Sequence, residues 1–222
     1  TEGKPTTVMD FTVPVDGLEA PWGIAQFNFI YDSAVVESFP TTLTGLADYL
    51  AENPGEFSYP LPPDFTRTTF LKQALIELSG QDEALAMAPD AKTFARVSAP
   101  LWEFLDGLHP NLWRGGKTFP ASWPAMRQLV DDGELSIMVS FTPTEAAALI
   151  LAEQLPDTVR AAGLAGGTIG NTHFLAVPYN SGSSEAAQVV ANFMMSPEAQ
   201  ARKMDPAVWG DATVLNVPAL SG

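Results

Sequence analysis

The sequence has no cysteine. Structural disulfides, thiolate zinc sites, iron–sulfur clusters and cysteine nucleophiles are therefore excluded. The redox compartment stays open, because a cysteine-free chain suits either side of a membrane. Long apolar runs are also missing, since no segment of the sequence approaches the roughly 18 apolar residues of a spanning helix. We therefore expect no direct insertion into a membrane.

Basic residues are scarce. Lys and Arg number 11 against 26 Asp and Glu, so the formal net charge is −15. This excess repels phosphate backbones and anionic lipids, and we expect no nucleic-acid partner. The hydrophobic content of 46% is ordinary for a globular protein.

Several catalytic and cofactor-binding motifs are absent. The sequence contains neither G-x-S-x-G nor H-E-x-x-H, and its glycines between 163 and 170 do not match G-x-G-x-x-G. Gly116-Lys117-Thr118 resembles the end of a P-loop, but the required first glycine is replaced by Asn111 and no apolar strand precedes it. The sequence therefore predicts no nucleotide triphosphatase, no cofactor, no metal site and no enzyme.

Two β-rich stretches organise the chain. Residues 20–32 form an aromatic and β-branched run after a turn at Ala20-Pro21, and residues 167–180 repeat that character far downstream. We predict that these stretches are neighbouring strands, with the intervening helices attached to the pair.

A candidate ligand-binding turn opens the helix predicted after Asp64. Arg67, Thr68 and Thr69 crowd its first turn, where free backbone N–H groups and the helix dipole favour an oxygen-rich ligand. The alternative is that one threonine caps the helix and the other polar side chains are solvated. The pattern of residues leaves both interpretations open.

A second candidate lies at a strand-to-helix corner. Residues 135–141 alternate as a strand does, and Thr142-Pro143-Thr144-Glu145 matches a capping box that begins an alanine-rich helix reaching about Gln154. In open α/β sheets, ligands bind at such corners, which makes Phe141 and Thr142 candidates.

The two histidines are His109 and His173. His173 lies among apolar residues beside Asn171, so a partly buried structural histidine is the favoured interpretation. The alternative is a ligand contact or a general base.

Several motifs resemble one family, the bacterial extracellular solute-binding proteins with the type II periplasmic-binding fold. Pro21-Trp22-Gly23 followed by residues 29–32 resembles the first interdomain crossing of that family, and residues 192–200 are similar to its helix pair. Three further segments, 112–120, 167–173 and 205–210, are similar to a narrower branch linked to ABC importers.

The resemblance implies a two-lobed receptor that closes on a small-molecule solute and passes it to an ABC permease in the membrane. It also implies a periplasmic or cell-surface-tethered location, and an α/β lobe with a mixed central sheet flanked by helices. Carried over by position, the implied ligand-binding residues are Trp22, Thr68, Thr69, Phe141, Thr142, Asn171, His173 and Trp209, to which we add Arg67 from the same helical turn.

The chain begins almost at the first crossing, so we expect a fragment that holds mainly the second lobe. The expected organisation is an N-terminal arm (1–20), a ligand-binding lobe (21–178) bounded by crossing strands 21–32 and 171–178, and a C-terminal helical segment (179–222). Val189, Val190 and Phe193 would lack part of their usual cover, which favours self-association.

Two other functions compete with a solute receptor. One is a periplasmic enzyme that uses His173 as general base, which requires a nearby carboxylate and a nucleophile. The other is a non-catalytic interaction domain, which requires no cavity near the corner.

Overall fold

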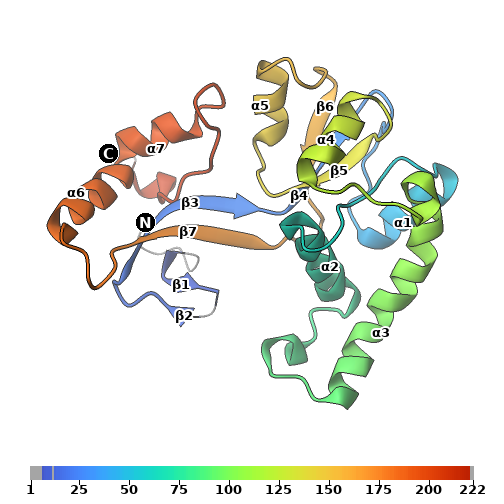
Figure 1. The fold of residues 1–222 in the computed structure, drawn as a ribbon, viewed down its shortest axis with the longest axis horizontal. Coiled ribbons are helices and arrows are strands. Elements are labelled where there is room, and N and C mark those ends of the chain that lie inside the picture. Colours follow the sequence, from blue (N-terminus) through green and yellow to red (C-terminus); the bar gives the residue numbers. More distant parts are fainter. Residues whose placement is uncertain (1–6, 12, 221–222) are drawn as a thin grey trace.

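The computed structural model describes residues 7–11 and 13–220, and these form two parts joined by a two-stranded ribbon (Figure 1). The ribbon consists of β3 (Glu19–Gln26) and β7 (Gly170–Ala176). The strands are antiparallel, and their pairing runs from Glu19 opposite Ala176 to Gln26 opposite Gly170. The prediction that the two β-rich stretches are neighbours is confirmed.

The first β-rich stretch divides at Phe27 into two strands. β4 (Asn28–Asp32) enters a separate sheet of order β5-β4-β6, with β5 at Ile137–Ser140 and β6 at Val159–Ala162. β4 is antiparallel to both neighbours, and a parallel bridge between Phe57 and Ile137 makes the sheet mixed. The expectation of one continuous strand was wrong, because the chain changes its pairing partners at Phe27.

Helices surround this sheet in the larger part, which we call the lobe (residues 27–169; Figure 1). They are α1 (Leu43–Glu52), α2 (Phe65–Leu78), α3 (Ala91–Leu108), α4 (Trp123–Asp131) and α5 (Glu145–Leu151), with 3-10 turns at Glu83–Ala86, His109–Asn111 and Trp113–Gly116. Aromatic side chains form the centre of the core, and Phe27, Phe29, Phe57, Tyr59 and Phe70 are fully buried. Neighbouring rings within this group have centroids 4.9–6.5 Å apart.

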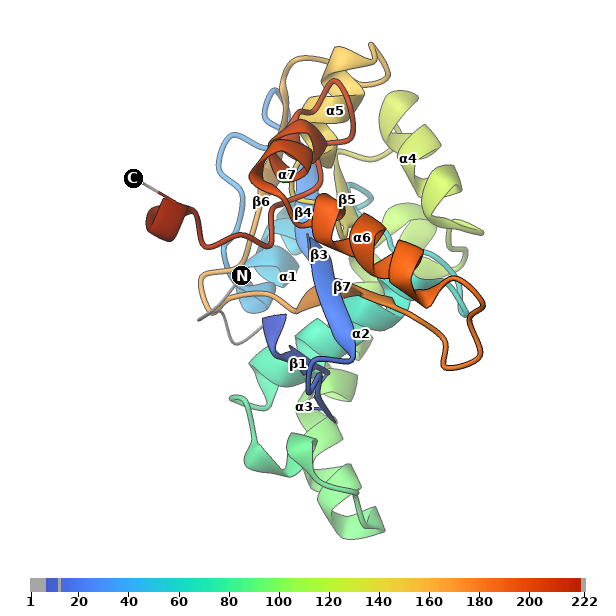
Figure 2. The same cartoon turned by 90° about the vertical axis from the view of Figure 1, so that its left-hand side faces the viewer.

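The smaller part lies at the other end of the ribbon. It contains the short strands β1 (Met9–Asp10) and β2 (Val13–Pro14), then α6 (Ser184–Met194), α7 (Pro197–Met204) and a 3-10 turn at Val217–Leu220. Figure 2 shows α6 and α7 packed over the ribbon. We call residues 177–220 the C-terminal segment. Residues 1–6 and 12 of the predicted arm lie outside the described residues.

No helix in the described part of the chain combines the length and apolar character needed to cross a membrane.

The starts of α1 and α5 are capped differently. Thr42 caps α1 by accepting from the Gly45 amide at 3.0 Å. The capping box expected at Thr142 was wrong, because α5 begins at Glu145 and its cap residue Thr144 makes no side-chain cap bond. Instead the Ser140 hydroxyl donates to the Glu145 carboxylate, and the Thr144 hydroxyl donates to the Gly210 carbonyl. The Glu145 carboxylate is thus engaged by the preceding strand and the Thr144 hydroxyl by the C-terminal segment, so neither serves as a cap.

Candidate functional site

The first turn of α2 is capped by Asp64 and not by a threonine. The Asp64 carboxylate accepts from the Thr66 amide at 2.8 Å and from the Trp123 amide at 3.0 Å, so it serves the starts of α2 and α4 together. The Thr68 and Thr69 hydroxyls donate to the carbonyls of Asp64 and Phe65, at 3.3 and 3.0 Å. The Asp64 carboxylate thus occupies the place where the helix dipole would attract an anionic ligand. Because the Thr68 and Thr69 hydroxyls already donate to carbonyls, they offer a ligand mainly hydrogen-bond acceptors.

Arg67 packs among aromatic rings of the lobe. Its guanidinium lies 5.4 Å from the Tyr59 ring centroid and 5.7 Å from that of Phe119. Burial raises the pKa of Tyr59 to about 12, against the opposing effect of Arg67. Burial, and then the Arg67 charge, lowers the pKa of His109, whose Nε2 is 2.6 Å from the Tyr59 hydroxyl. These contacts tie Arg67 to the core of the lobe.

The strand-to-helix corner is fixed directly to the end of the ribbon. The Phe141 carbonyl accepts from the backbone N–H of Gln26 at 3.1 Å, and the backbone N–H of Thr142 donates to the Ser140 hydroxyl at 3.1 Å. Burial raises the pKa of Glu145, which accepts from Ser140, while that hydrogen bond and the Arg127 charge oppose the rise. The corner is therefore held by a buried polar network.

An exposed aromatic wall stands at this corner. The Phe65 ring meets the Phe141 ring edge to face at 5.0 Å and 83°, and Phe65 is 58% exposed. The sequence analysis did not identify Phe65 as a candidate site residue. The available signal was that Phe65 is the first residue of α2 and is not one of the buried positions of that helix, such as Thr66, Thr69 and Phe70.

A hollow of about 210 Å³ lies beside the corner. Its lining combines the end of the ribbon and the start of β4 with the corner, the end of β6 and the segment after it, namely Gln26, Phe27, Asn28, Pro143, Ala161, Ala162, Gly163 and Thr168. The side-chain amide of Gln26 donates to the Thr168 hydroxyl at 3.0 Å. Sequence reasoning missed both residues, because neither forms part of a chemical motif.

Asn171 and His173 lie on one face of the ribbon. Asn171 is opposite Ala25 and His173 is opposite Gly23, so the two side chains start about 7 Å apart. The side chains of Asp211 and His173 lie over Gly23. A Cβ at position 23 would be 2.5 Å from Asp211 Oδ2 and 3.2 Å from His173 Nδ1, so a glycine is needed there. His173 is exposed, and its ring has no hydrogen-bond partner among residues 7–11 and 13–220. The expectation of a partly buried, satisfied histidine was wrong.

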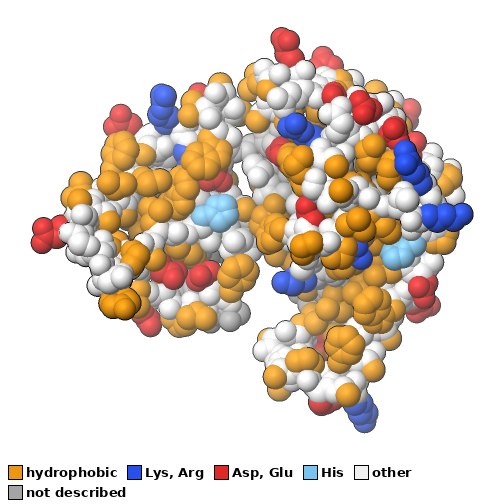
Figure 3. Space-filling model, in the orientation of Figure 1, with side chains coloured by type: hydrophobic (Ala, Val, Ile, Leu, Met, Phe, Trp, Pro, Cys, Tyr) orange, Lys and Arg blue, Asp and Glu red, His pale blue; other side chains and the backbone are white. Residues whose placement is uncertain are grey.

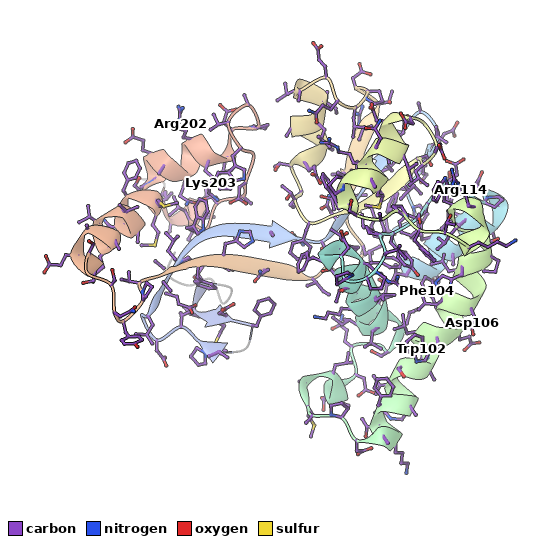
Figure 4. The ribbon with its side chains drawn as sticks, viewed as in Figure 1. Trp102, Phe104, Asp106, Arg114, Arg202 and Lys203 are labelled. Atoms are coloured by element: carbon purple, nitrogen blue, oxygen red, sulfur yellow. The ribbon has the colours of Figure 1, made fainter. Side chains whose placement is uncertain are left out.

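Trp22 and Trp209 meet at the middle of the ribbon. Their ring centroids are 5.0 Å apart at 66°, and they line a groove of about 240 Å³ with side chains of α6 and α7. Beneath them Lys203 Nζ binds Asp211 Oδ2 at 2.7 Å, and both residues are buried. Figure 4 shows Lys203 on the ribbon side of α7 and Arg202 on its outer side.

The structure thus divides the predicted site residues into separate groups. Phe141, Thr142 and Asn171 lie near the lobe end of the ribbon, whereas Trp22 and His173 lie at its middle, with Trp209 against Trp22. Trp22 and Gln26 are four strand steps apart, about 13 Å. The surface is hollowed between the two parts (Figure 3), and the Thr144–Gly210 hydrogen bond joins them across that gap.

The ribbon that links two parts, one of them a helix-flanked mixed sheet, is the arrangement found in the type II periplasmic-binding fold. Solved structures with this fold resemble the chain. The sulfate-binding protein SubI of Mycobacterium tuberculosis matches with a TM-score of 0.60 and 18% identity, over 90% of this chain and 60% of that one. The spermidine/putrescine substrate-binding protein PotD of Streptococcus pneumoniae matches with a TM-score of 0.63 and 14% identity, over 88% and 53%.

The sequence comparisons place the chain in a family. The family model described as "Bacterial extracellular solute-binding protein" matches residues 2–218, so the chain belongs to that family. Protein YnjB of Escherichia coli K12 is 50% identical over 207 residues, which is 93% of this chain. The chain spans about half, 53%, of the length of that relative.

Proposed function

We propose that this chain belongs to the substrate-binding component of an ABC-type importer, which captures a small solute between two lobes and delivers it to a membrane permease. The observation that carries the proposal is the direct hydrogen bond from Gln26 at the end of the ribbon to Phe141 at the corner. This hydrogen bond holds the corner, where we place the solute, beside the ribbon about which the two lobes would move. The family description supports a periplasmic or cell-surface location.

The corner offers the chemistry that a small-molecule site needs. Phe65 and Phe141 supply an apolar wall, while Gln26, Thr168 and Asn171 supply polar groups near the same end of the ribbon. Such a mixture of aromatic walls and a few placed polar groups orients a bound solute. In this proposal the Thr144–Gly210 contact forms part of the closed arrangement.

We also propose that the protein binds without catalysis. A histidine base is commonly oriented by a carboxylate, and the carboxylate near His173 belongs to Asp211. Asp211 is held by Lys203 at 2.7 Å, so its charge is already paired. The aromatic corner accounts for binding with no reacting group.

The proposal is tested by thermal-shift screening of the intact receptor against small nutrients. The screen includes thiamine-like compounds, sugars, polyamines and oxyanions. We expect one class to raise the melting temperature without being converted to product. The Phe141→Ala variant should weaken binding about tenfold or more, as loss of a central aromatic contact does. The exposed Phe94→Ala variant on α3 is the control. Full affinity in F141A and N171A would contradict this placement of the site.

A second proposal concerns self-association through α6. Val189, Val190 and Phe193 are 70%, 56% and 59% exposed, and they form an uncovered apolar face. A second copy of the chain would bury this face.

A further inference from the structure

One hydrogen bond joins the lobe to the C-terminal segment across the hollow between them. The Thr144 hydroxyl at the start of α5 donates to the Gly210 carbonyl in the loop after α7 (Figure 1). Among the hydrogen bonds and ion pairs of residues 7–11 and 13–220, it is the only one between residues 27–169 and residues 177–220. Polar contact between the two parts outside the ribbon therefore depends on this pair.

Lys203 holds the loop that presents Gly210. The Lys203 carbonyl accepts from the backbone N–H groups of Gly210 and Asp211, at 3.0 and 3.1 Å. Its ammonium group binds Asp211 Oδ2 at 2.7 Å and donates to the Ala212 carbonyl at 2.6 Å. Lys203 and Gly210 are both buried. These four contacts fix the loop around one side chain, and the Gly210 carbonyl is left for Thr144.

Thr144 is committed to this contact on the lobe side. It is the cap residue of α5, where a threonine hydroxyl ordinarily accepts from a backbone N–H of the first turn, yet its side chain makes no cap bond. A Cβ at position 210, where φ is +80°, would lie 3.1 Å from Thr144 Oγ1 and 3.4 Å from Thr144 Cβ. The close approach of the two parts therefore requires a glycine at position 210.

The same short loop carries Thr144 and the solute corner. Phe141 and Thr142, where we place the solute, come just before Thr144 in the sequence. The Phe141 carbonyl accepts from the backbone N–H of Gln26, and the Thr142 carbonyl accepts from that of Glu145 at 3.0 Å. Because residues 141–144 are tied down at both ends, a movement of Thr144 relative to the C-terminal segment reaches the corner directly.

We propose that the Thr144–Gly210 hydrogen bond is a latch, which holds the lobe and the C-terminal segment in the closed arrangement and whose release opens the solute corner. This inference rests on the proposed function, since it assigns the latch to closure around a solute. A hydrogen bond of ordinary net strength favours the closed arrangement about two- to tenfold. The latch therefore opens without unfolding of the lobe, whose aromatic core does not include it.

Double electron–electron resonance on the 222-residue chain tests the latch without any solute. Because the sequence has no cysteine, spin labels attach only at introduced positions, Leu151→Cys on α5 and Ala201→Cys on α7, both exposed. Labelled chain is diluted with unlabelled chain, so that only distances within one molecule are counted. Thr144→Val removes the hydroxyl and should shift the ratio of short to long distances about two- to tenfold toward long. Thr118→Val, at an exposed threonine of the lobe, should leave the ratio unchanged.

A second variant tests the latch from the other side. Gly210→Ala places a Cβ against Thr144 and should lengthen the distance between the labels as T144V does. Gly133→Ala is the matched control, because Gly133 also has a positive φ, +72°, but open space around its Cβ position. The proposal is overturned if T144V and G210A keep the distances of the unaltered chain, or if G133A lengthens them as much as G210A. Solute-dependent melting of the intact receptor is a separate measurement, so failure of the latch leaves the proposed function standing.

Discussion

The lobe and the C-terminal segment are stabilised in different ways. In the lobe, aromatic side chains such as Phe29, Phe57 and Phe70 are fully buried against one another. In the C-terminal segment, α6 has no fully buried residue, and its apolar face is open. The lobe thus rests on apolar burial, whose free energy grows with the area removed from water.

Polar contacts attach the C-terminal segment to the ribbon. The Gln200 amide donates to the carbonyls of Trp22 and Met194, at 2.9 and 2.8 Å, and its oxygen accepts from the Val214 amide at 3.1 Å. Lys203 and Asp211 form the buried ion pair beside them. The comparison teaches that the lobe carries its own core, whereas the C-terminal segment depends on a few buried polar groups that tolerate no loss of a partner.

The largest expected effect is in the lobe. Phe29→Ala removes a fully buried ring at the meeting point of Phe27, Phe39, Phe57 and Phe70. We expect the free energy of unfolding, measured in urea, to fall by about 3–5 kcal/mol, as for other buried Phe→Ala changes. The exposed Phe94→Ala is the control. A loss below 1 kcal/mol in F29A would mean that the aromatic cluster does not support the lobe.

The ion pair comes next. Lys203→Met leaves the Asp211 carboxylate buried without its partner, which costs about 3 kcal/mol. Amide exchange should quicken in α7 and in the ribbon around Trp22 while the lobe stays protected. Arg202→Met, on the exposed side of the same helix, should change nothing. Equal exchange in K203M and R202M would show that the pair does not hold the segment.

Glu145 gives a smaller, pH-dependent effect at the join between the two regions. Its folded-state pKa lies above the ordinary value of 4.5 because it is buried, so its ionisation favours unfolding as the pH rises above that value. Glu145→Gln keeps an acceptor for Ser140 and removes this cost. We expect E145Q to be more stable than the unaltered chain at neutral pH and to lose that advantage as the pH falls to 4. Thermal melts at the two pH values decide it, and an advantage independent of pH would refute the interpretation.

The smallest effect on stability is expected on α6. Phe193→Ser changes an exposed residue, so the free energy of unfolding should move by no more than about 0.5 kcal/mol. Sedimentation velocity should show self-association of the unaltered chain that decreases in F193S. Glu185→Gln, on the same helix, is the control. If the unaltered chain stays monomeric at high concentration, this interface is ruled out.

The elements with local signals were predicted well. α1 has helical spacing of its apolar residues behind the Thr42 cap, and Ser196-Pro197 marks the start of α7, so the sequence indicates both helices locally. β6 was missed because Val159–Ala162 is short, contains two alanines and lacks a β-rich pattern. The division at Phe27 was also missed, since one continuous apolar run shows no change of strand partner.

The candidate site was predictable in part. The resemblance named Phe141, Asn171, Trp22 and Trp209 as residues of one ligand site. The structure places Phe141 and Asn171 near the lobe end of the ribbon, and Trp22 in contact with Trp209 at the middle of the ribbon. It did not reveal that Asp64 replaces the threonines as the cap of α2, nor that Phe65 lies against Phe141. Such contacts depend on packing between distant segments, which a local pattern does not encode.

The most direct test of the account is hydrogen exchange of the intact receptor with and without its solute. The account places the solute at the lobe end of the ribbon. Solute should therefore slow exchange of the amides around Gln26, Phe141, Thr142 and Asn171, and leave the outer face of α6 unchanged. Protection confined to α6 or to the C-terminal end of α2, with the corner unaffected, would contradict the account.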